Sequence, residues 1–175
     1  IGLLTSSKQH TSSQTPWLLA IPLLICGSIF TYGHLCFDGH YLQAHNAWRK
    51  KNWTQLIDQA NFALQCGPFN HRILLLQGLA HQQRGDHQKA VQAYKQAQNY
   101  HPNDGHAALG SAYAALGNTN RAVDHYRRES LLYPNQATAA LDLANALLKS
   151  GNAPEAITYY HKATVISPTL FSAWL

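Results

Sequence analysis

Histidine is the most conspicuous residue with reactive chemistry in this sequence of 175 residues, which contains eleven of them. Two histidines on one helix can share a metal ion when they lie three or four residues apart. The shortest spacings here are five and six residues, as in His40/His45, His101/His106 and His81/His87. We therefore expect no metal site, and we expect the histidines to lie in solvent or within helix interfaces.

The three cysteines are Cys26, Cys36 and Cys66. They form no CxxC pair and no even-numbered framework, so the spacing predicts neither a zinc site nor a disulfide scaffold. We expect them to act as small apolar packing residues. Their pattern leaves the redox compartment open.

No catalytic or nucleic-acid-binding pattern is visible. The sequence has no glycine-rich phosphate loop, no GxSxG motif and only two glutamates, Glu129 and Glu155. Lys and Arg number 13 against 8 acidic residues, and their only clusters are 49–51 and 127–128. A nucleic-acid-binding surface would present a basic stripe with interleaved aromatic residues. We predict no enzyme activity in this chain, no cofactor and no nucleic-acid partner.

One segment is long and apolar enough to cross a membrane. Residues 17–37 contain no Asp, Glu, Lys or Arg, and a helix of this length spans a hydrocarbon core of about 30 Å. Trp17 and Tyr32 suit the two membrane interfaces. A cleaved signal peptide and a buried soluble helix are the alternatives, but the run exceeds a usual signal core. We predict a transmembrane helix at 16–37.

The charges that flank this segment bear on its orientation. Arg49, Lys50 and Lys51 follow it closely, whereas Lys8 alone precedes it. Because positive residues concentrate on the cytoplasmic side, this bias favours an integral membrane protein with its C-terminal part in the cytoplasm. Further spans before Ile1 would override the bias.

The C-terminal part repeats itself. Pro68, Pro102, Pro134 and Pro168 recur at nearly equal intervals, and only the step from Pro102 to Pro134 is shorter, by two residues. Alanine lies twelve residues before each of the last three prolines, tyrosine eight before and glycine seventeen before. These recurring positions are Ala90, Ala122 and Ala156; Tyr94, Tyr126 and Tyr160; and Gly85, Gly117 and Gly151. A fixed period of this length indicates stacked helical hairpins.

Local signals agree with two helices in each repeat. Gly85 and Asp86 read as a helix stop followed by an N-cap. Asn152, Pro154 and Glu155 offer a cap, an early-turn proline and a capping-box acid. The shorter step between the second and third prolines predicts a tightened turn or a shortened helix between Pro102 and Gly110, and we expect the tyrosines to fill the space between neighbouring hairpins.

At these residues the chain resembles the tetratricopeptide repeat family, whose pattern is W-x2-L-G-x2-Y followed by G, A, an aromatic, A and P. The copy at 103–134 matches closely, with Leu109, Gly110 and Tyr113 ahead of its glycine, alanine, tyrosine and proline. The copy at 71–102 has His81 at the usual tyrosine position, and the copy at 135–168 has Ala144 and Leu147 at the glycine and tyrosine positions. The resemblance implies an all-α superhelix.

A degenerate copy precedes these three. Counting back one full repeat places Ala44, Ala47, Ala60 and Pro68 on repeat positions, and the turn glycine is replaced near Lys51. We therefore predict a polar leader or loop at 1–15, a transmembrane helix at 16–37, a degenerate repeat at 38–70, repeats at 71–102, 103–134 and 135–168, and the start of a further repeat at 169–175. Because the chain begins without Met and stops at Trp174-Leu175, we expect it to be part of a longer protein.

The resemblance also implies a concave groove lined by the first helix of each repeat. Carried over from the family, the groove residues are Leu75, Leu79, Gln82, Ala107, Ser111, Ala114, Leu141, Asn145 and Leu148, and we expect Arg72 and Lys149 at the edges of the groove. Some of these positions could equally serve packing. We expect a membrane-anchored scaffold whose groove binds a protein or peptide segment.

A second interpretation stays open. Some membrane glycan enzymes of the O-antigen ligase and polymerase kind carry such repeats after many spans. The chain would then be the C-terminal tail of such an enzyme, with all catalytic residues before Ile1. More apolar spans directly upstream would favour this alternative.

Overall fold

We describe the protein from a computed structural model, in which residues 35–67 and 70–168 are described. All regular structure in these residues is α-helical. Helical residues 35–49 are followed by seven further helices: α2 (Trp53–Cys66), α3 (His71–Gln83), α4 (His87–Tyr100), α5 (His106–Ala115), α6 (Thr119–Leu132), α7 (Ala137–Lys149) and α8 (Ala153–Ile166).

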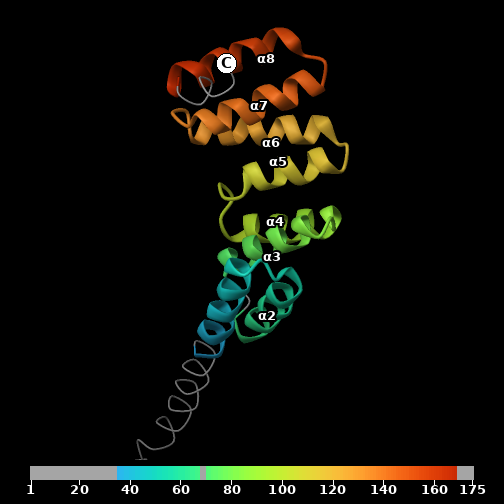
Figure 1. Cartoon of the computed structure of the whole chain (residues 1–175), viewed down its shortest axis with the longest axis vertical. Helices are drawn as coiled ribbons and strands as arrows, with labels where there is room; N and C mark the ends of the chain where they lie inside the picture. Colours follow the sequence, from blue (N-terminus) through green and yellow to red (C-terminus); the bar gives the residue numbers. More distant parts are fainter. Residues whose placement is uncertain (1–34, 68–69, 169–175) are drawn as a thin grey trace, which may run out of the picture.

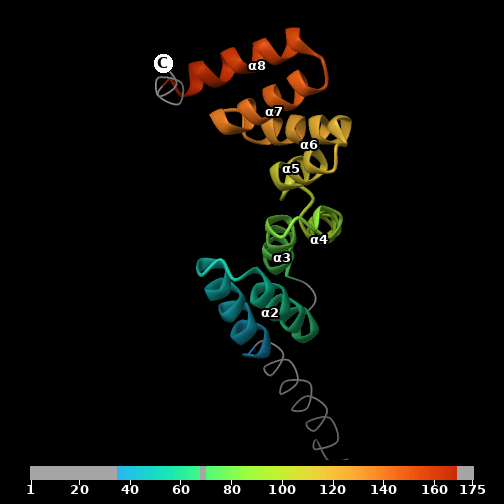
Figure 2. The same ribbon diagram turned by 45° about the vertical axis from the view of Figure 1, so that its right-hand side comes forward.

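The helices stack one upon another along the long axis of the molecule (Figures 1 and 2). Each helix packs mainly against its neighbours in sequence, and α3 with α4, α5 with α6 and α7 with α8 form the closest pairs. Two apolar clusters run through the stack: one joins residues 44–80, and the other joins residues 90–156. The predicted all-α solenoid of helical hairpins is confirmed.

The turn inside each hairpin has the same geometry in all four pairs. Gly85, Gly117 and Gly151 have φ values of 82°, 75° and 86°, in the left-handed region that glycine adopts without a Cβ clash. Lys51, one full repeat before Gly85, takes the same conformation with φ of 55°. In each turn the next amide donates to a carbonyl five residues back, as from Asn52 to Ala47 at 2.9 Å. The pair at residues 35–66 is thus built like the others, with a lysine where glycine would be less strained.

Asparagine side chains begin most of the second helices. Asn52, Asn118 and Asn152 each accept a hydrogen bond from the backbone amide three residues on, which satisfies one free donor of the first turn. At Asn152 the predicted capping acid is in place, but Glu155 accepts from the side-chain amide of Asn152 at 2.7 Å. The backbone N–H of Asn152, which a capping box would use, donates to the Leu147 carbonyl instead. Asp86 stands at the N-cap of α4, but its side chain accepts no capping hydrogen bond. Its carboxylate lies 3.6 Å from His81 Nδ1 instead.

The α3–α4 and α5–α6 hairpins each contain a close approach between a glycine and a tyrosine. Tyr94 lies against Gly78, and Tyr126 lies against Gly110. Tyr94 and Tyr126 therefore fill the space between the two helices of one hairpin. They also belong to the apolar cluster that continues into the next hairpin, so our expectation that the tyrosines fill the space between hairpins describes only part of their role. Because Gly78 and Gly110 have no Cβ, each leaves space in the first helix of its hairpin, and the tyrosine ring of the second helix fills that space.

The shorter step from Pro102 to Pro134 corresponds to a shortened helix, α5. α5 has 10 residues, whereas α3 and α7 have 13 each. Gly105 takes the N-cap position with φ of 76° and offers no side chain as a cap. Glu129 of α6 supplies the missing acceptor, because its Oε2 receives the Ala107 amide at 3.2 Å.

The predicted membrane span at 16–37 lies outside the described residues, apart from 35–37, which are helical. These last positions belong to the helical stack, since Phe37 packs against the first apolar cluster. Among the described helices, none combines the length and apolar character that a membrane crossing requires.

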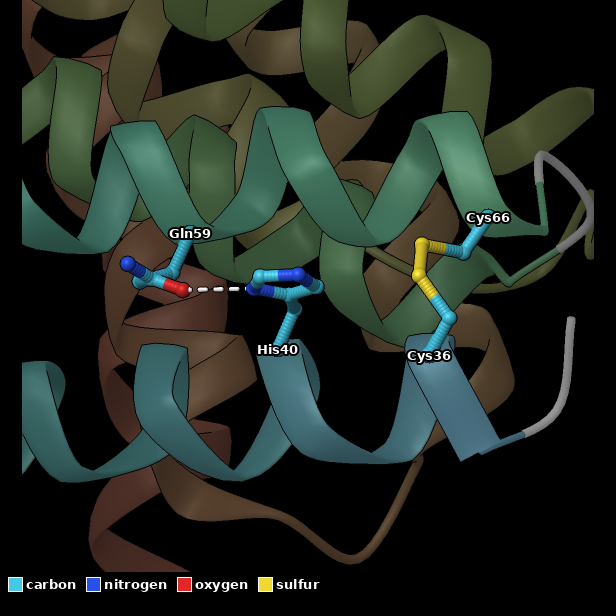
Figure 3. Close-up of a disulfide and its surroundings, with 4 residues drawn as sticks. All are labelled: Cys36, His40, Gln59 and Cys66. Carbon is cyan, nitrogen blue, oxygen red and sulfur yellow. Dashed lines mark hydrogen bonds between the residues drawn. A yellow bond between two sulfur atoms is a disulfide. The ribbon is translucent and has the colours of Figure 1, made fainter. Parts of the chain in front are cut away.

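A disulfide joins Cys36 and Cys66 and closes the open end of the first hairpin (Figure 3). Their Cα atoms are 5.8 Å apart, within the usual range for a disulfide. Our expectation that both are packing residues is therefore wrong. Their sequence separation of 30 carries no spacing signal, and only the antiparallel pairing of the two helices brings the thiols together.

Two histidines form a hydrogen-bonded pair between α5 and α6. His106 is 3% exposed, and its Nδ1 lies 3.1 Å from His125 Nδ1. The Gln98 amide nitrogen also lies 3.2 Å from His106 Nδ1, and because an amide nitrogen only donates, His106 Nδ1 must accept. Burial, reinforced by His106 and Arg128, lowers the pKa of His125 to about 4. Burial likewise lowers the pKa of His106. Both rings are therefore held neutral.

Acid should destabilise the fold through this pair. An unfolded histidine binds a proton below its ordinary pKa of about 6.5, whereas folded His125 does so only near 4, so the free energy of unfolding should fall between these values as the pH is lowered. Urea unfolding followed by circular dichroism from pH 7 to 4 measures this slope. His125→Phe keeps a ring beside Tyr113 and should flatten the slope. The exposed His161→Phe should leave it unchanged, and equal slopes in all three proteins would refute the assignment.

Candidate partner-binding groove

An apolar groove runs along the N-terminal half of the stack. It encloses about 530 Å³ and is lined by side chains from residues 35–49, α3, α4, α5 and α6. The lining residues are Tyr41, His45, Trp48, Arg72, Leu75, Leu76, Leu79, Tyr94, Gly105, Ala107, Ala108 and Glu129. Leu75, Leu79 and Ala107, which the family resemblance places in a groove, are thus brought together here, and Arg72, which we expected at its edge, lies with them.

The degenerate repeat contributes three groove residues that our sequence analysis missed. Tyr41, His45 and Trp48 lie one full repeat before Leu75, Leu79 and Gln82. Extending the repeat register upstream would therefore have identified them. His45 and Trp48 lie against each other with ring centroids 5.3 Å apart, and the Trp48 side chain stays 39% exposed, so this end of the groove presents aromatic surface.

The groove carries one cation and one carboxylate. Arg72 is exposed at the start of α3. Glu129 is engaged by the Ala107 amide, and burial raises the pKa of its carboxyl group above the usual range. The bond from Ala107 opposes this shift without cancelling it. Arg72 is therefore the charged group best placed to meet an incoming ligand.

A network of polar side chains joins α3, α4 and α5 next to the groove. The Tyr94 hydroxyl donates to Gln82 Oε1 at 3.0 Å, and Gln82 Nε2 donates to Ser111 Oγ at 2.8 Å. Ser111 also hydrogen-bonds with Tyr126. Gln82 and Ser111, which we expected to contact a partner, satisfy each other and join neighbouring hairpins. The bond between Gln82 and Ser111 therefore links α3 to α5.

The other expected groove residues lie further along the stack. Asn145 Oδ1 accepts from the Tyr160 hydroxyl at 2.7 Å, and Leu148 is 52% exposed. Lys149 lines a separate shallow depression with residues 116–120 and Ser150. Ala114 and Leu141 are half-buried, and Ala114 packs against the second apolar cluster. Of these residues, none lines the groove defined above.

Two groups of three potential metal ligands occur in the described residues, and our rule of spacing within one helix could not detect them. One group is Cys36, His40 and Cys66, and the other is His71, His101 and Asp104. In the first group the sulfur atoms are joined as a disulfide, and His40 Nδ1 lies 2.8 Å from Gln59 Oε1 (Figure 3). With both sulfurs in that bond, the first group lacks the thiolates that bind metal ions.

Comparison with known proteins agrees with this geometry. Tetratricopeptide repeat models match residues 72–104 and 107–170, which together take in more than half of the chain. No curated protein matches the sequence.

Solved structures share the fold. A crystal structure of MamA superposes with a TM-score of 0.73 at 17% identity, over 83% of this chain and 90% of that chain. A tetratricopeptide repeat protein from Parabacteroides merdae gives 0.71 at 17% identity, over 77% and 55%. The tetratricopeptide repeat domain of Arabidopsis OM64 gives 0.63 at 16% identity, over 65% and 96%. The recurring glycines, tyrosines and prolines, the hairpin turns and the matched family models all agree. The chain belongs to the tetratricopeptide repeat family.

Proposed function

We propose that this protein is a non-enzymatic scaffold that binds a segment of a partner protein in the apolar groove. The observation that carries the proposal is the convergence of Trp48, Leu75 and Leu79 from successive hairpins on one cavity. An apolar concave surface held by a rigid stack suits a ligand that inserts several hydrophobic side chains.

The chemistry of the groove restricts the partner. Leucine and aromatic walls favour apolar anchor residues on the ligand, and exposed Arg72 favours an acidic group beside them. Either an amphipathic helix or an extended segment presents such side chains in a row. A strongly basic partner is disfavoured.

Membrane attachment through residues 16–34 is part of the proposal and rests on their apolar sequence alone, since Phe37 and Cys36 belong to the helical stack. For the location of the repeats, two observations disagree. The charges at 49–51 favour the cytoplasm, whereas the Cys36–Cys66 disulfide favours an oxidising compartment. We give more weight to the disulfide, because a reducing cytosol works against such a bond while the charge bias is only statistical. We therefore propose that the repeats lie outside the cytosol. The role as the tail of a membrane glycan enzyme stays a second prediction that concerns residues before Ile1.

Peptide selection tests the groove directly. A random peptide library displayed on phage would be selected on the full chain, and dissociation constants would be measured for the enriched peptides by fluorescence anisotropy. We expect a consensus with spaced apolar residues and an acidic residue. Leu79→Glu should weaken binding about 10-fold to 100-fold, since losing one buried leucine contact removes roughly 1.5–3 kcal/mol.

The matched control is Ile157→Glu, which introduces the same charge at a 68% exposed aliphatic residue of α8. It should bind with wild-type affinity. Equal affinity of wild type and Leu79→Glu, or a consensus without apolar residues, would contradict the proposal.

A further inference from the structure

A cluster of two imidazoles and a carboxylate lies where the α3–α4 hairpin meets α5. His71 is the first residue of α3, His101 follows the end of α4, and Asp104 lies in the turn before α5. His71 Nε2 lies 3.3 Å from Asp104 Oδ2, and the rings of His71 and His101 have centroids 3.9 Å apart. One ligand atom from each residue lies within 4.8 Å of those of the other two.

The fold positions this cluster without help from a ligand. Antiparallel packing of α3 on α4 places the start of one helix beside the end of the other. The turn that follows is held by its own hydrogen bonds, from the Asp104 amide to the His101 carbonyl at 3.0 Å and from Gln98 Nε2 to the Asp104 carbonyl at 3.1 Å. The three side chains thus come from a braced framework, which lowers the entropic cost of gathering them around an ion.

The distances suit a divalent first-row metal. Nitrogen and oxygen ligands lie about 2.0–2.2 Å from zinc, so two of them on a tetrahedral ion are roughly 3.3–3.5 Å apart. The His71–Asp104 distance of 3.3 Å already meets this requirement. The contact between His71 and Asp104 alone could be an ordinary ion pair. His101 sets the cluster apart from such a pair, because it adds a third potential ligand. Two imidazoles with one carboxylate form a set that binds zinc and related ions and leaves coordination positions for water.

We propose that His71, His101 and Asp104 bind a divalent first-row transition metal ion, with zinc as the representative. The ion ties the start of α3, the end of α4 and the turn into α5 to one another. The neighbouring charge of Arg72 opposes a bound cation and so limits the affinity. The proposal is independent of partner binding in the groove.

Calorimetric titration of the full chain with Zn²⁺ tests the site. The protein must be stripped with chelator, carry no histidine tag and be kept without reductant, so that the Cys36–Cys66 disulfide withholds its thiolates. We expect one dominant site, together with a zinc-dependent rise in the melting temperature. Asp104→Asn and His101→Ala should each weaken binding at least about tenfold, because even residues that only orient metal ligands contribute that much.

Two controls separate this site from adventitious binding. His161→Ala removes an exposed histidine of α8 and should bind zinc as the wild type does. Circular dichroism of the metal-free His101→Ala protein should match the metal-free wild type, because His101 is exposed. Wild-type affinity in Asp104→Asn and His101→Ala, or an equal loss in His161→Ala, would overturn the proposal.

Discussion

Removing the Cys36–Cys66 disulfide is expected to lower the free energy of unfolding of the first hairpin by about 3–4 kcal/mol. The bond closes a loop across 30 residues, and a cross-link of that span removes much conformational entropy from the unfolded chain. The first hairpin depends on it strongly, because Lys51 occupies a left-handed turn and the hairpin has a neighbouring repeat only at α3 among the described residues. Hydrogen exchange of amides at 35–66 in a Cys36→Ser/Cys66→Ser variant measures the loss.

The control is Cys26→Ser, which removes a cysteine and leaves the disulfide in place. It should exchange like the wild type, and reductant should have no effect on the double variant. In cells, acid quenching followed by alkylation should find Cys36 and Cys66 oxidised if the repeats lie outside the cytosol. Unchanged exchange in the double variant would contradict the stabilising role, and reduced thiols in cells would contradict the proposed location.

Gly78→Ala is expected to destabilise the protein by about 1–3 kcal/mol, although alanine favours a helix over glycine by up to about 1 kcal/mol. A Cβ at this position would lie 2.6 Å from Cδ1 of Tyr94. The ring cannot move aside easily, because Tyr94 is 2% exposed and its hydroxyl is bonded to Gln82. Overpacking therefore outweighs the gain in helix propensity. Urea unfolding monitored by circular dichroism gives the change in midpoint.

Gly39→Ala is the control, and it should change the stability in the opposite direction. Gly39 lies in helical residues 35–49, and a Cβ there would meet nothing within 4 Å. Alanine should therefore raise stability by about 0.5–1 kcal/mol. Stabilisation by both substitutions would show that the contact between Gly78 and Tyr94 is looser than described.

The helical hairpins were predictable because their signals are local and periodic. Turn glycines such as Gly117, caps such as Asn152 and the proline spacing each act within a few residues, and repetition made them visible. The shortened α5 followed from the two residues missing from one repeat step. Even the strained turn at Lys51 lies where the register places it.

The disulfide and the histidine–aspartate cluster were not predictable by the same reasoning. Cys36 meets Cys66, and His71 meets Asp104, only because antiparallel helices bring distant residues together. A rule about spacing within one helix misses contacts of this kind. The same limit applies to Gln82. The repeat register predicts its position, but its hydrogen bond to Ser111 depends on where α5 lies.

Photo-crosslinking in cells of the source organism shows directly whether the groove receives a partner protein. A photoreactive phenylalanine analogue would be placed at Leu79 in the groove or at Ile157 on α8, in the full-length protein. We expect a discrete crosslinked product from position 79, identified by mass spectrometry, that is absent from position 157 and is lost when Leu75→Glu is added. The same products from both positions, or a product at 79 that survives Leu75→Glu, would contradict partner binding in the groove.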